Sequence, residues 1–164
     1  MIKASMFTIL FLTPFVLLSG NISDDPIIVK EITADYQEKL SILKIECLLD
    51  IPPPWHVNSG SLKQEYLIPT RVLLADSSKG YLVKREYPDP MTLVLFGQQL
   101  EVFDGELRFK TFFYLNADKA FPLRAVLQYQ SCDDKMCLPP QFRDFSIMKT
   151  GDKGLQTVFQ HPPP

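Results

Sequence analysis

The sequence lacks most of the features that mark nucleic-acid-binding and metal-binding proteins. Its 17 Lys and Arg residues are outnumbered by 19 Asp and Glu residues, for a net charge of −2. No basic cluster or basic amphipathic stretch suggests nucleic acid or a membrane surface as a partner. There are only 3 cysteines, and no second cysteine pair or nearby histidine completes a zinc site around the two closest ones. We therefore expect no nucleic acid, no metal and no other cofactor.

The sequence also has no convincing amphipathic helix, no internal repeat and no sign of a second domain. Its 164 residues are a one-domain length, and 46% of them are apolar. This is ordinary for a globular protein with a sizeable core. We expect a monomer with a single compact domain.

The one long hydrophobic run lies at the N-terminus. Met6 to Leu18 is apolar, Lys3 precedes it, and the small residues Ser19 and Gly20 follow it. A run of this length is too short for a comfortable membrane span and is typical of a secretory signal. Residues 1–20 are therefore predicted to be a signal peptide that is removed. An exported, periplasmic chain would be in a compartment where disulfides persist.

The remaining chain has the periodicity of short β-strands. Leu43, Ile45, Cys47 and Leu49 alternate with more polar residues, so Cys47 is expected to be a buried free cysteine. Strands are expected over 27–32, 40–50, 67–75, 81–87, 100–103, 106–115, 121–130 and 142–148, while 91–97 is either a strand or an ordered loop. Asp104-Gly105 is a strong hairpin signal. Turn signals about every 8–12 residues predict an all-β sandwich over residues 21–150, with a flexible tail over 151–164.

Cys132 and Cys137 lie between two of these expected strands, with four residues separating them. A loop of that length is common in hairpins. Opposed residues of an antiparallel pair have Cα atoms about 4.5–5.5 Å apart, and a disulfide needs about 4.4–6.8 Å. If the two cysteines are opposed, they can bond without any movement of the backbone.

Spacing alone leaves the role of this pair open. A structural staple over so short a loop would stabilise the fold by only about 2 kcal/mol in the chain-entropy model. A reversible dithiol is the second interpretation, and half a zinc site is the third. Asp133 and Asp134 disfavour a thiolate at Cys132, and only Lys135 opposes them.

The motif around the pair is more specific than its spacing. Tyr129-Gln130-Ser131-Cys132, a short acidic loop and Cys137-Leu138-Pro139-Pro140 resemble the N-terminal periplasmic domain of the thiol:disulfide interchange protein DsbD, in the family of disulfide bond corrector domains. The resemblance implies an immunoglobulin-like sandwich with one cysteine pair near an end and Tyr129 beside the site. It also implies that Cys137 attacks the partner and that Cys132 resolves the mixed disulfide.

Two further stretches carry the resemblance. In Trp55-His56-Val57-Asn58 it implies that His56 and Asn58 line the cysteine site, although His56 could equally be a surface histidine in a turn. At Val102 to Gly105 it implies that Phe103 caps the cysteines and moves aside for a partner. The alternative for Phe103 is an ordinary core residue at a strand end.

These features predict a protein thiol–disulfide oxidoreductase that acts as a relay. It would take electrons from a membrane-embedded or thioredoxin-like donor and pass them to the disulfides of exported proteins. The chain shows one cysteine pair and no second redox centre, so it cannot draw electrons across a membrane by itself. The alternative is a secreted β-sandwich that binds a partner and keeps Cys132–Cys137 as a structural disulfide.

Overall fold

A computed structural model describes residues 25–60, 66–95, 97–116, 121–151 and 154–160. The predicted signal peptide, residues 1–20, lies outside them. The described chain is almost entirely strand: β1 (Ile28–Gln37), β2 (Ile42–Ile51), β3 (His56–Asn58), β4 (Arg71–Leu74), β5 (Gly80–Glu86), β6 (Met91–Leu95), β7 (Gln98–Phe103), β8 (Gly105–Leu115), β9 (Leu123–Tyr129), β10 (Ser131–Cys132), β11 (Gln141–Thr150) and β12 (Gly154–Phe159). Two 3₁₀ turns, Glu38–Leu40 and Ser77–Lys79, are the only helical elements described. Neither is long or apolar enough to span a membrane.

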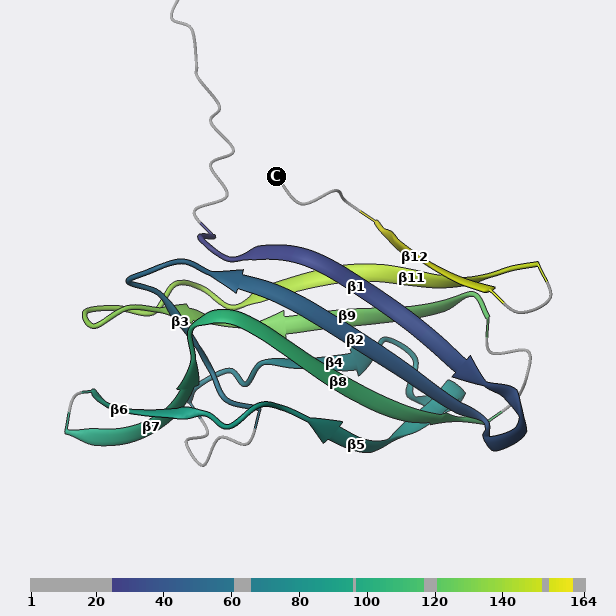
Figure 1. Cartoon of the computed structure of the whole chain (residues 1–164), viewed down its shortest axis with the longest axis horizontal. Coiled ribbons are helices and arrows are strands. Elements are labelled where there is room, and N and C mark those ends of the chain that lie inside the picture. Colours follow the sequence, from purple (N-terminus) through teal and green to yellow (C-terminus); the bar gives the residue numbers. More distant parts are fainter. Residues whose placement is uncertain (1–24, 61–65, 96, 117–120, 152–153, 161–164) are drawn as a thin grey trace, which may run out of the picture.

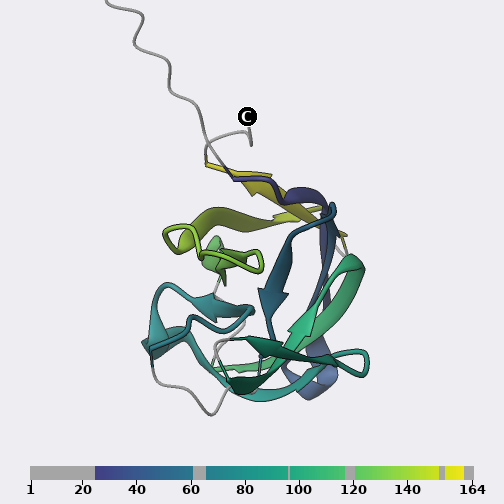
Figure 2. The same ribbon diagram turned by 90° about the vertical axis from the view of Figure 1, so that its left-hand side faces the viewer.

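The strands form three antiparallel sheets of four strands each. Their orders are β1-β2-β8-β5, β12-β11-β9-β4 and β10-β3-β7-β6. The first two sheets make the two layers of the sandwich, and the third lies at one end, on the left of Figure 1 and toward the viewer in Figure 2. The predicted immunoglobulin-like β-sandwich is thereby confirmed.

The core fills from alternate positions of the strands, as β2 shows. Leu43, Ile45, Cys47 and Leu49 are wholly buried, whereas the residues between them are partly exposed. The expectation for Cys47 is confirmed, since it is free and buried. Burial raises the pKa of its thiol, which keeps it protonated and unreactive.

The hairpin predicted at Asp104-Gly105 is wrong. β7 pairs with β3 and β6, whereas β8 pairs with β2 and β5. Gly105 has φ +61°, a backbone conformation that favours glycine, and the chain turns there from one sheet into another. The hairpin lies one strand earlier, where β6 and β7 pair in register from Leu95 and Gln98 outward. The segment left undecided at 91–97 is therefore mainly strand.

The flexible tail predicted from residue 151 is wrong over β12. This strand pairs with β11 along its whole length. Leu155 and Phe159 pack against the core, and the Thr157 hydroxyl donates to the carbonyl of Ile32 in β1 at 2.6 Å. The alternation of Leu155, Thr157 and Phe159 gives β12 one face that can be buried. Residues 161–164 of the predicted tail lie outside the described chain.

We expect Phe159→Ala to lower the free energy of unfolding by about 2 kcal/mol, less than the ~3–5 kcal/mol of a wholly buried Phe. Phe159 is half-buried, and its ring packs against Phe145 at 6.3 Å between centroids. Urea denaturation is the measurement. Val158→Ala is the matched control, because Val158 is 37% exposed and its truncation should change little. Equal effects of the two substitutions would mean that β12 does not contribute to the fold.

Candidate functional site

The two cysteines of the motif face each other across a narrow antiparallel ladder. Cys132 and Cys137 form an isolated bridge with Cα atoms 4.0 Å apart, and their sulfurs are bonded. Two backbone hydrogen bonds flank the bridge, from the Leu138 amide to the Ser131 carbonyl at 2.8 Å and from the Asp133 amide to the Met136 carbonyl at 2.9 Å. The opposed arrangement that the disulfide argument required is therefore present.

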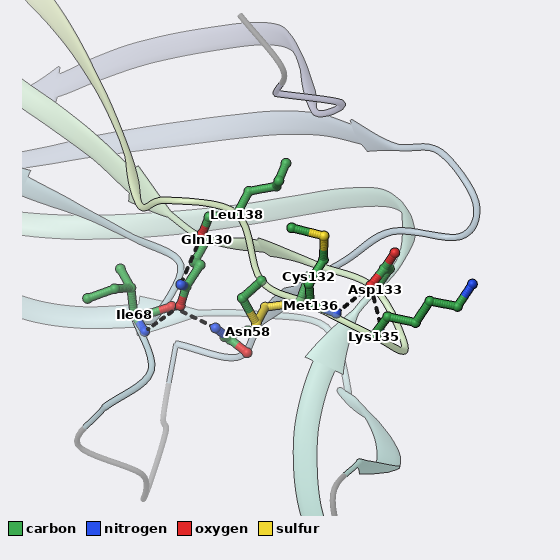
Figure 3. The surroundings of a disulfide bond; sticks show 9 residues. Asn58, Ile68, Gln130, Cys132, Asp133, Lys135, Met136 and Leu138 are labelled. Carbon is green, nitrogen blue, oxygen red and sulfur yellow. Dashed lines mark hydrogen bonds between the residues drawn. A yellow bond between two sulfur atoms is a disulfide. The ribbon is translucent and has the colours of Figure 1, made fainter.

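The loop between the cysteines is held by its own first residue. One oxygen of the Asp133 carboxylate accepts hydrogen bonds from the amides of Lys135 at 2.8 Å and Met136 at 2.7 Å (Figure 3). This is the Asx-turn geometry that Asp favours. The two amides hold the pKa of Asp133 below its ordinary value, so the carboxylate stays negatively charged. Its hydrogen bonds to these amides lie within the loop itself.

The two halves of the disulfide differ sharply in exposure. Cys132 is 2% exposed, whereas Cys137 and its neighbour Met136 are exposed. Met136 lies beside the bond in Figure 3 with 53% of its surface accessible. Because attack on a disulfide requires access to a sulfur atom, a group that approaches from solvent meets Cys137 first.

Strand β3 brings a histidine to the buried cysteine. In the ladder of β10 and β3, Cys132 is opposite His56 and Ser131 is opposite Val57. Directly opposed side chains of an antiparallel pair lie on the same face. His56 therefore shares a face with Cys132, while Val57 is wholly buried in the core. His56 is 4% exposed, so it is not a surface histidine in a turn.

Asn58 follows two residues later and so lies on the face of His56. Its side-chain amide donates to the carbonyl of Ile68 at 3.1 Å. Among the described residues, its Oδ1 and the Nε2 of His56 are buried without hydrogen-bond partners. Burial lowers the pKa of His56, against the opposing effect of Asp133 and Asp104. The imidazole is therefore neutral near pH 7. The two unpaired polar atoms belong to residues on the face of β3 that His56 shares with Cys132.

Gln130 ties the cysteine loop to the segment that follows β3. Its Oε1 accepts a hydrogen bond from the Ile68 amide at 3.2 Å, and its Nε2 donates to the Leu138 carbonyl at 3.1 Å. Figure 3 shows Gln130 between these two backbones, with Asn58 bonded to the same Ile68. The side chain thus fixes the chain just after Cys137 relative to the strand that carries His56.

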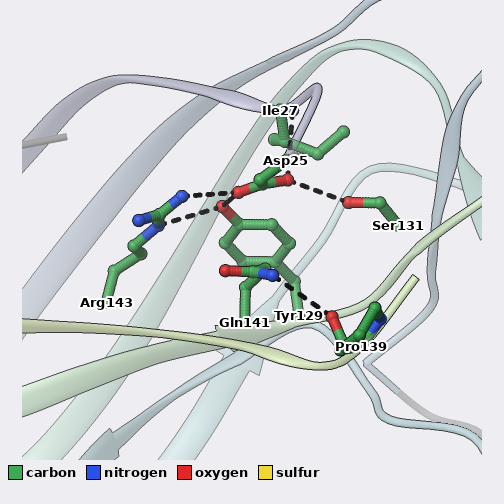
Figure 4. Close-up of polar contacts among 7 residues, drawn as sticks. All are labelled: Asp25, Ile27, Tyr129, Ser131, Pro139, Gln141 and Arg143. Carbon is green, nitrogen blue, oxygen red and sulfur yellow. Dashed lines mark hydrogen bonds and ion pairs between the residues drawn. The ribbon is translucent and has the colours of Figure 1, made fainter. Parts of the chain in front are cut away.

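Tyr129 belongs to a buried polar group that we call the Asp25 cluster: Asp25, Tyr129, Ser131 and Arg143 (Figure 4). The Asp25 carboxylate pairs with the Tyr129 hydroxyl, with Arg143 Nη2 at 2.7 Å and with the Ser131 hydroxyl at 3.1 Å. Only 1% of the Asp25 side chain is exposed. Burial and the contact with Asp25 raise the pKa of Tyr129. Tyr129 therefore anchors the strand leading to Cys132, and its hydroxyl is engaged within this cluster.

Sequence reasoning missed most of this cluster. Asp25 is separated from Tyr129 by 104 residues and from Ser131 by 106, and it lies before the first expected strand, at 27–32. No local pattern distinguishes a buried aspartate of this kind from a solvated one. Only one feature of the sequence indicated that Arg143 points inward. It lies two residues before Phe145 on β11, so the two side chains share a face.

The structure places Phe103 in the core, as its alternative reading had it. Phe103 is opposite Val57 in the ladder of β3 and β7, on the face away from His56 and Cys132. It is 5% exposed and stacks on Tyr87 with centroids 5.7 Å apart. A cap over the cysteines is therefore not supported at this residue, because the pleat directs its side chain inward.

No metal centre accompanies the cysteines within the described ranges, which hold no cluster of three His, Cys, Asp or Glu residues suited to a metal ion. A cavity of about 570 Å³ lies at the opposite end of β1 from the Asp25 cluster, lined by Tyr36, Gln37, Glu38, Lys39, Leu40, Lys149, Gly154 and Leu155. Its lining contains no cysteine. The cavity is therefore separate from the cysteine site, whose chemistry depends on the cysteine pair and its neighbours.

A family model described as thiol:disulfide interchange protein DsbD, N-terminal, matches residues 33–149, more than half of the chain. The N-terminal periplasmic domain of ScsB from Proteus mirabilis is similar in fold, with a TM-score of 0.51 and 19% identity over 70% of this chain. The chain spans only 42% of that structure.

Two structures from Neisseria meningitidis are less similar, each with a TM-score of 0.46. The reduced DsbD n-terminal domain is 15% identical, over 78% of this chain and 89% of that one. The DsbD N-terminal domain in complex with the PilB N-terminal domain is 17% identical, over 82% and 91%. No curated protein matches the chain. The family match is therefore the comparison that bears on function.

We expect Phe103→Ala to lower the free energy of unfolding by about 3–5 kcal/mol, the usual cost of truncating a buried Phe. The rate at which a small thiol reduces the disulfide should stay unchanged in the folded protein, because Phe103 does not shield it. Phe142→Ala is the control, since Phe142 is 57% exposed. Faster reduction with little loss of stability would restore the cap.

We expect Asp25→Ala to lower the free energy of unfolding by about 2–3 kcal/mol, because it leaves the buried Tyr129 and the mostly buried Arg143 without their partner. Asp50→Ala is the matched control. Asp50 pairs with Lys30 at 3.2 Å, but both side chains are more than one third exposed, so its removal should cost less than about 1 kcal/mol. Thermal and urea unfolding are the measurements. If Asp25→Ala and Asp50→Ala lost the same free energy of unfolding, the Asp25 cluster would have no special role.

Proposed function

Since the chain belongs to the family of the N-terminal domain of the thiol:disulfide interchange protein DsbD, we propose that it relays electrons through Cys132 and Cys137 as an exported thiol–disulfide exchange protein. Its donor would be a membrane-embedded or thioredoxin-like protein, and its acceptors would be disulfides of exported proteins. The single observation that carries the proposal is the pairing of an exposed Cys137 with a buried Cys132 in one short-loop disulfide.

Reduction of the pair follows from this asymmetry. A donor thiolate attacks the exposed sulfur of Cys137, so a donor–Cys137 bond forms and the Cys132–Cys137 bond breaks. Cys132 leaves as a thiolate and takes up a proton. The second thiolate of the donor then attacks the donor sulfur that is bonded to Cys137. A disulfide forms within the donor, and Cys137 is released as a thiolate. The donor has lost two electrons, and both cysteines of the chain are reduced.

Transfer to the acceptor reverses these steps. The Cys137 thiolate attacks the acceptor disulfide, and one acceptor thiolate leaves. Cys132 then loses its proton and attacks Cys137, which restores the intramolecular disulfide and releases the second acceptor thiolate. Cys137 is thus the nucleophile and Cys132 the resolving cysteine.

An exported location fits this chemistry, because a disulfide pair persists in an oxidising compartment. The ScsB domain that shares the fold is periplasmic by description, and the N-terminal stretch of this chain has the composition of a signal peptide. We place the mature protein in the periplasm or another exported compartment.

Trapping of the mixed disulfide tests the proposal. Cys132→Ser leaves Cys137 able to attack but removes the resolving thiol, so covalent adducts with exported thioredoxin-like proteins should accumulate on non-reducing gels. Cys137→Ser should trap few or none, because the remaining thiol is 2% exposed. The double variant should trap nothing and still fold, since the bond contributes only about 2 kcal/mol.

Each other outcome has a definite meaning. Adducts formed through Cys132 would reverse the two roles. If neither single variant formed an adduct and the double variant were unfolded, the disulfide would be structural. The protein would then fit the alternative of a secreted β-sandwich that binds a partner.

A further inference from the structure

Three residues that can take part in disulfide exchange and the proton transfer that accompanies it are paired in sequence across neighbouring backbones. Cys137 is opposite Cys132, and Cys132 is opposite His56. We propose that His56 accepts the proton of Cys132 during resolution and returns a proton to it during reduction. This inference rests on the proposed function, since it concerns the resolving step of the same exchange.

The register gives His56 the necessary proximity. Directly opposed residues of an antiparallel pair have Cβ atoms about 4.5–5.5 Å apart and lie on the same face, and His56 and Cys132 are such a pair. Cys132 is 2% exposed and His56 is 4% exposed. Water has little access to either side chain, so a proton that leaves Cys132 needs an acceptor within the protein.

The unpaired nitrogen of His56 indicates what that acceptor is. Its Nε2 is buried and has no hydrogen-bond partner among the described residues, whereas buried polar atoms in proteins are nearly always paired. In the disulfide form Cys132 has no S–H group to donate. Reduction creates one directly opposite His56, and a neutral imidazole with its lone pair on Nε2 can accept it.

The charges around His56 suit a base of this kind. Asp133, in the cysteine loop next to β10, and Asp104, which follows β7, are the charged groups that act on it from the two strands beside β3. Burial outweighs their effect and lowers the pKa of the imidazole, so His56 is neutral and able to accept a proton near pH 7. Once it is protonated, the negative charge of Asp133 stabilises the imidazolium.

Resolution begins with a proton transfer. Nε2 takes the proton of the Cys132 thiol, and the Cys132 thiolate attacks the sulfur of Cys137. A Cys132–Cys137 bond forms, the Cys137–partner bond breaks, and the electron pair of that bond leaves with the partner thiolate. The proton on His56 passes to that thiolate or to water, and the histidine is ready for the next cycle.

A small aromatic disulfide, dithiobis(nitrobenzoate), separates the two steps when it is mixed with the fully reduced protein. Attack by Cys137 releases the first thionitrobenzoate at a rate that depends on reagent concentration. Attack by Cys132 on the mixed disulfide releases the second at a rate that does not. Both releases are followed by absorbance in stopped flow, at one equivalent of reagent.

We expect His56→Gln to slow the second release about tenfold or more at pH 7, while the first changes by less than about twofold. In the unsubstituted protein the second rate should fall as the pH drops through the lowered pKa of His56, because the protonated imidazole accepts no proton. That inflection should be absent from the variant. The deficit of the variant should also shrink as the pH approaches about 8.5, where an ordinary thiol ionises unaided.

Three controls make the result decisive. His161→Gln removes the other histidine of the chain and should leave both releases unchanged. His56→Asn is a second substitution of the same residue, and thermal unfolding identifies either variant that fails to fold. An unchanged second release in a folded His56 variant, or equal slowing of both releases, overturns the role of His56. A reduced unsubstituted protein that releases no thionitrobenzoate overturns the proposed function itself.

Discussion

The short ladder between β10 and β3 is the constraint on which this site depends. It is only two residues long, Ser131 with Val57 and Cys132 with His56, yet it decides which side chains meet the cysteine pair. A shift of one residue would turn His56 toward the core and Val57 toward the disulfide, because side chains alternate along a strand. The wholly buried Val57 opposes such a shift, since it belongs to the hydrophobic core. Packing of the interior therefore fixes the chemistry at the end of the sandwich.

Polar contacts keep the two cysteines in unequal positions. On the buried side, the Asp25 cluster holds Tyr129 and Ser131, which lead directly to Cys132. On the exposed side, Gln130 holds the chain after Cys137, and Asp133 closes the loop through two of its amides. Hydrogen bonds thus hold both ends of the cysteine loop, while Cys137 remains exposed.

Cys47 shows how strongly position governs the behaviour of a thiol in one molecule. It lies in the middle of β2, wholly buried in the hydrophobic core, and burial raises the pKa of its thiol. Such a group neither ionises nor meets a partner. Cys137 is the same residue type in an exposed loop, bonded to Cys132 and one strand removed from His56. The difference between an inert and an exchangeable sulfur therefore comes from the surroundings.

The sequence by itself determined the strand periodicity and the burial of Cys47, because each of these depends on spacing within a few residues. The spacing of Cys132 and Cys137 allowed a disulfide, and the structure showed that the two cysteines are opposed. Only the tertiary structure decided that Asp104-Gly105 is a corner between sheets, that Phe103 is a core residue, and that Asp25 lies beside Tyr129. It also showed that Gly154–Phe159 forms a strand. The first three depend on which distant strand becomes the neighbour, and pairing between strands far apart in the chain leaves no local pattern to predict it. β12 differs, because it pairs with the preceding strand β11, and its alternation of Leu155, Thr157 and Phe159 is a local pattern. As with those first three features, no local pattern predicts the pairing of His56 with Cys132, which only the family resemblance implied; the two residues are far apart in the sequence and directly opposed in the fold.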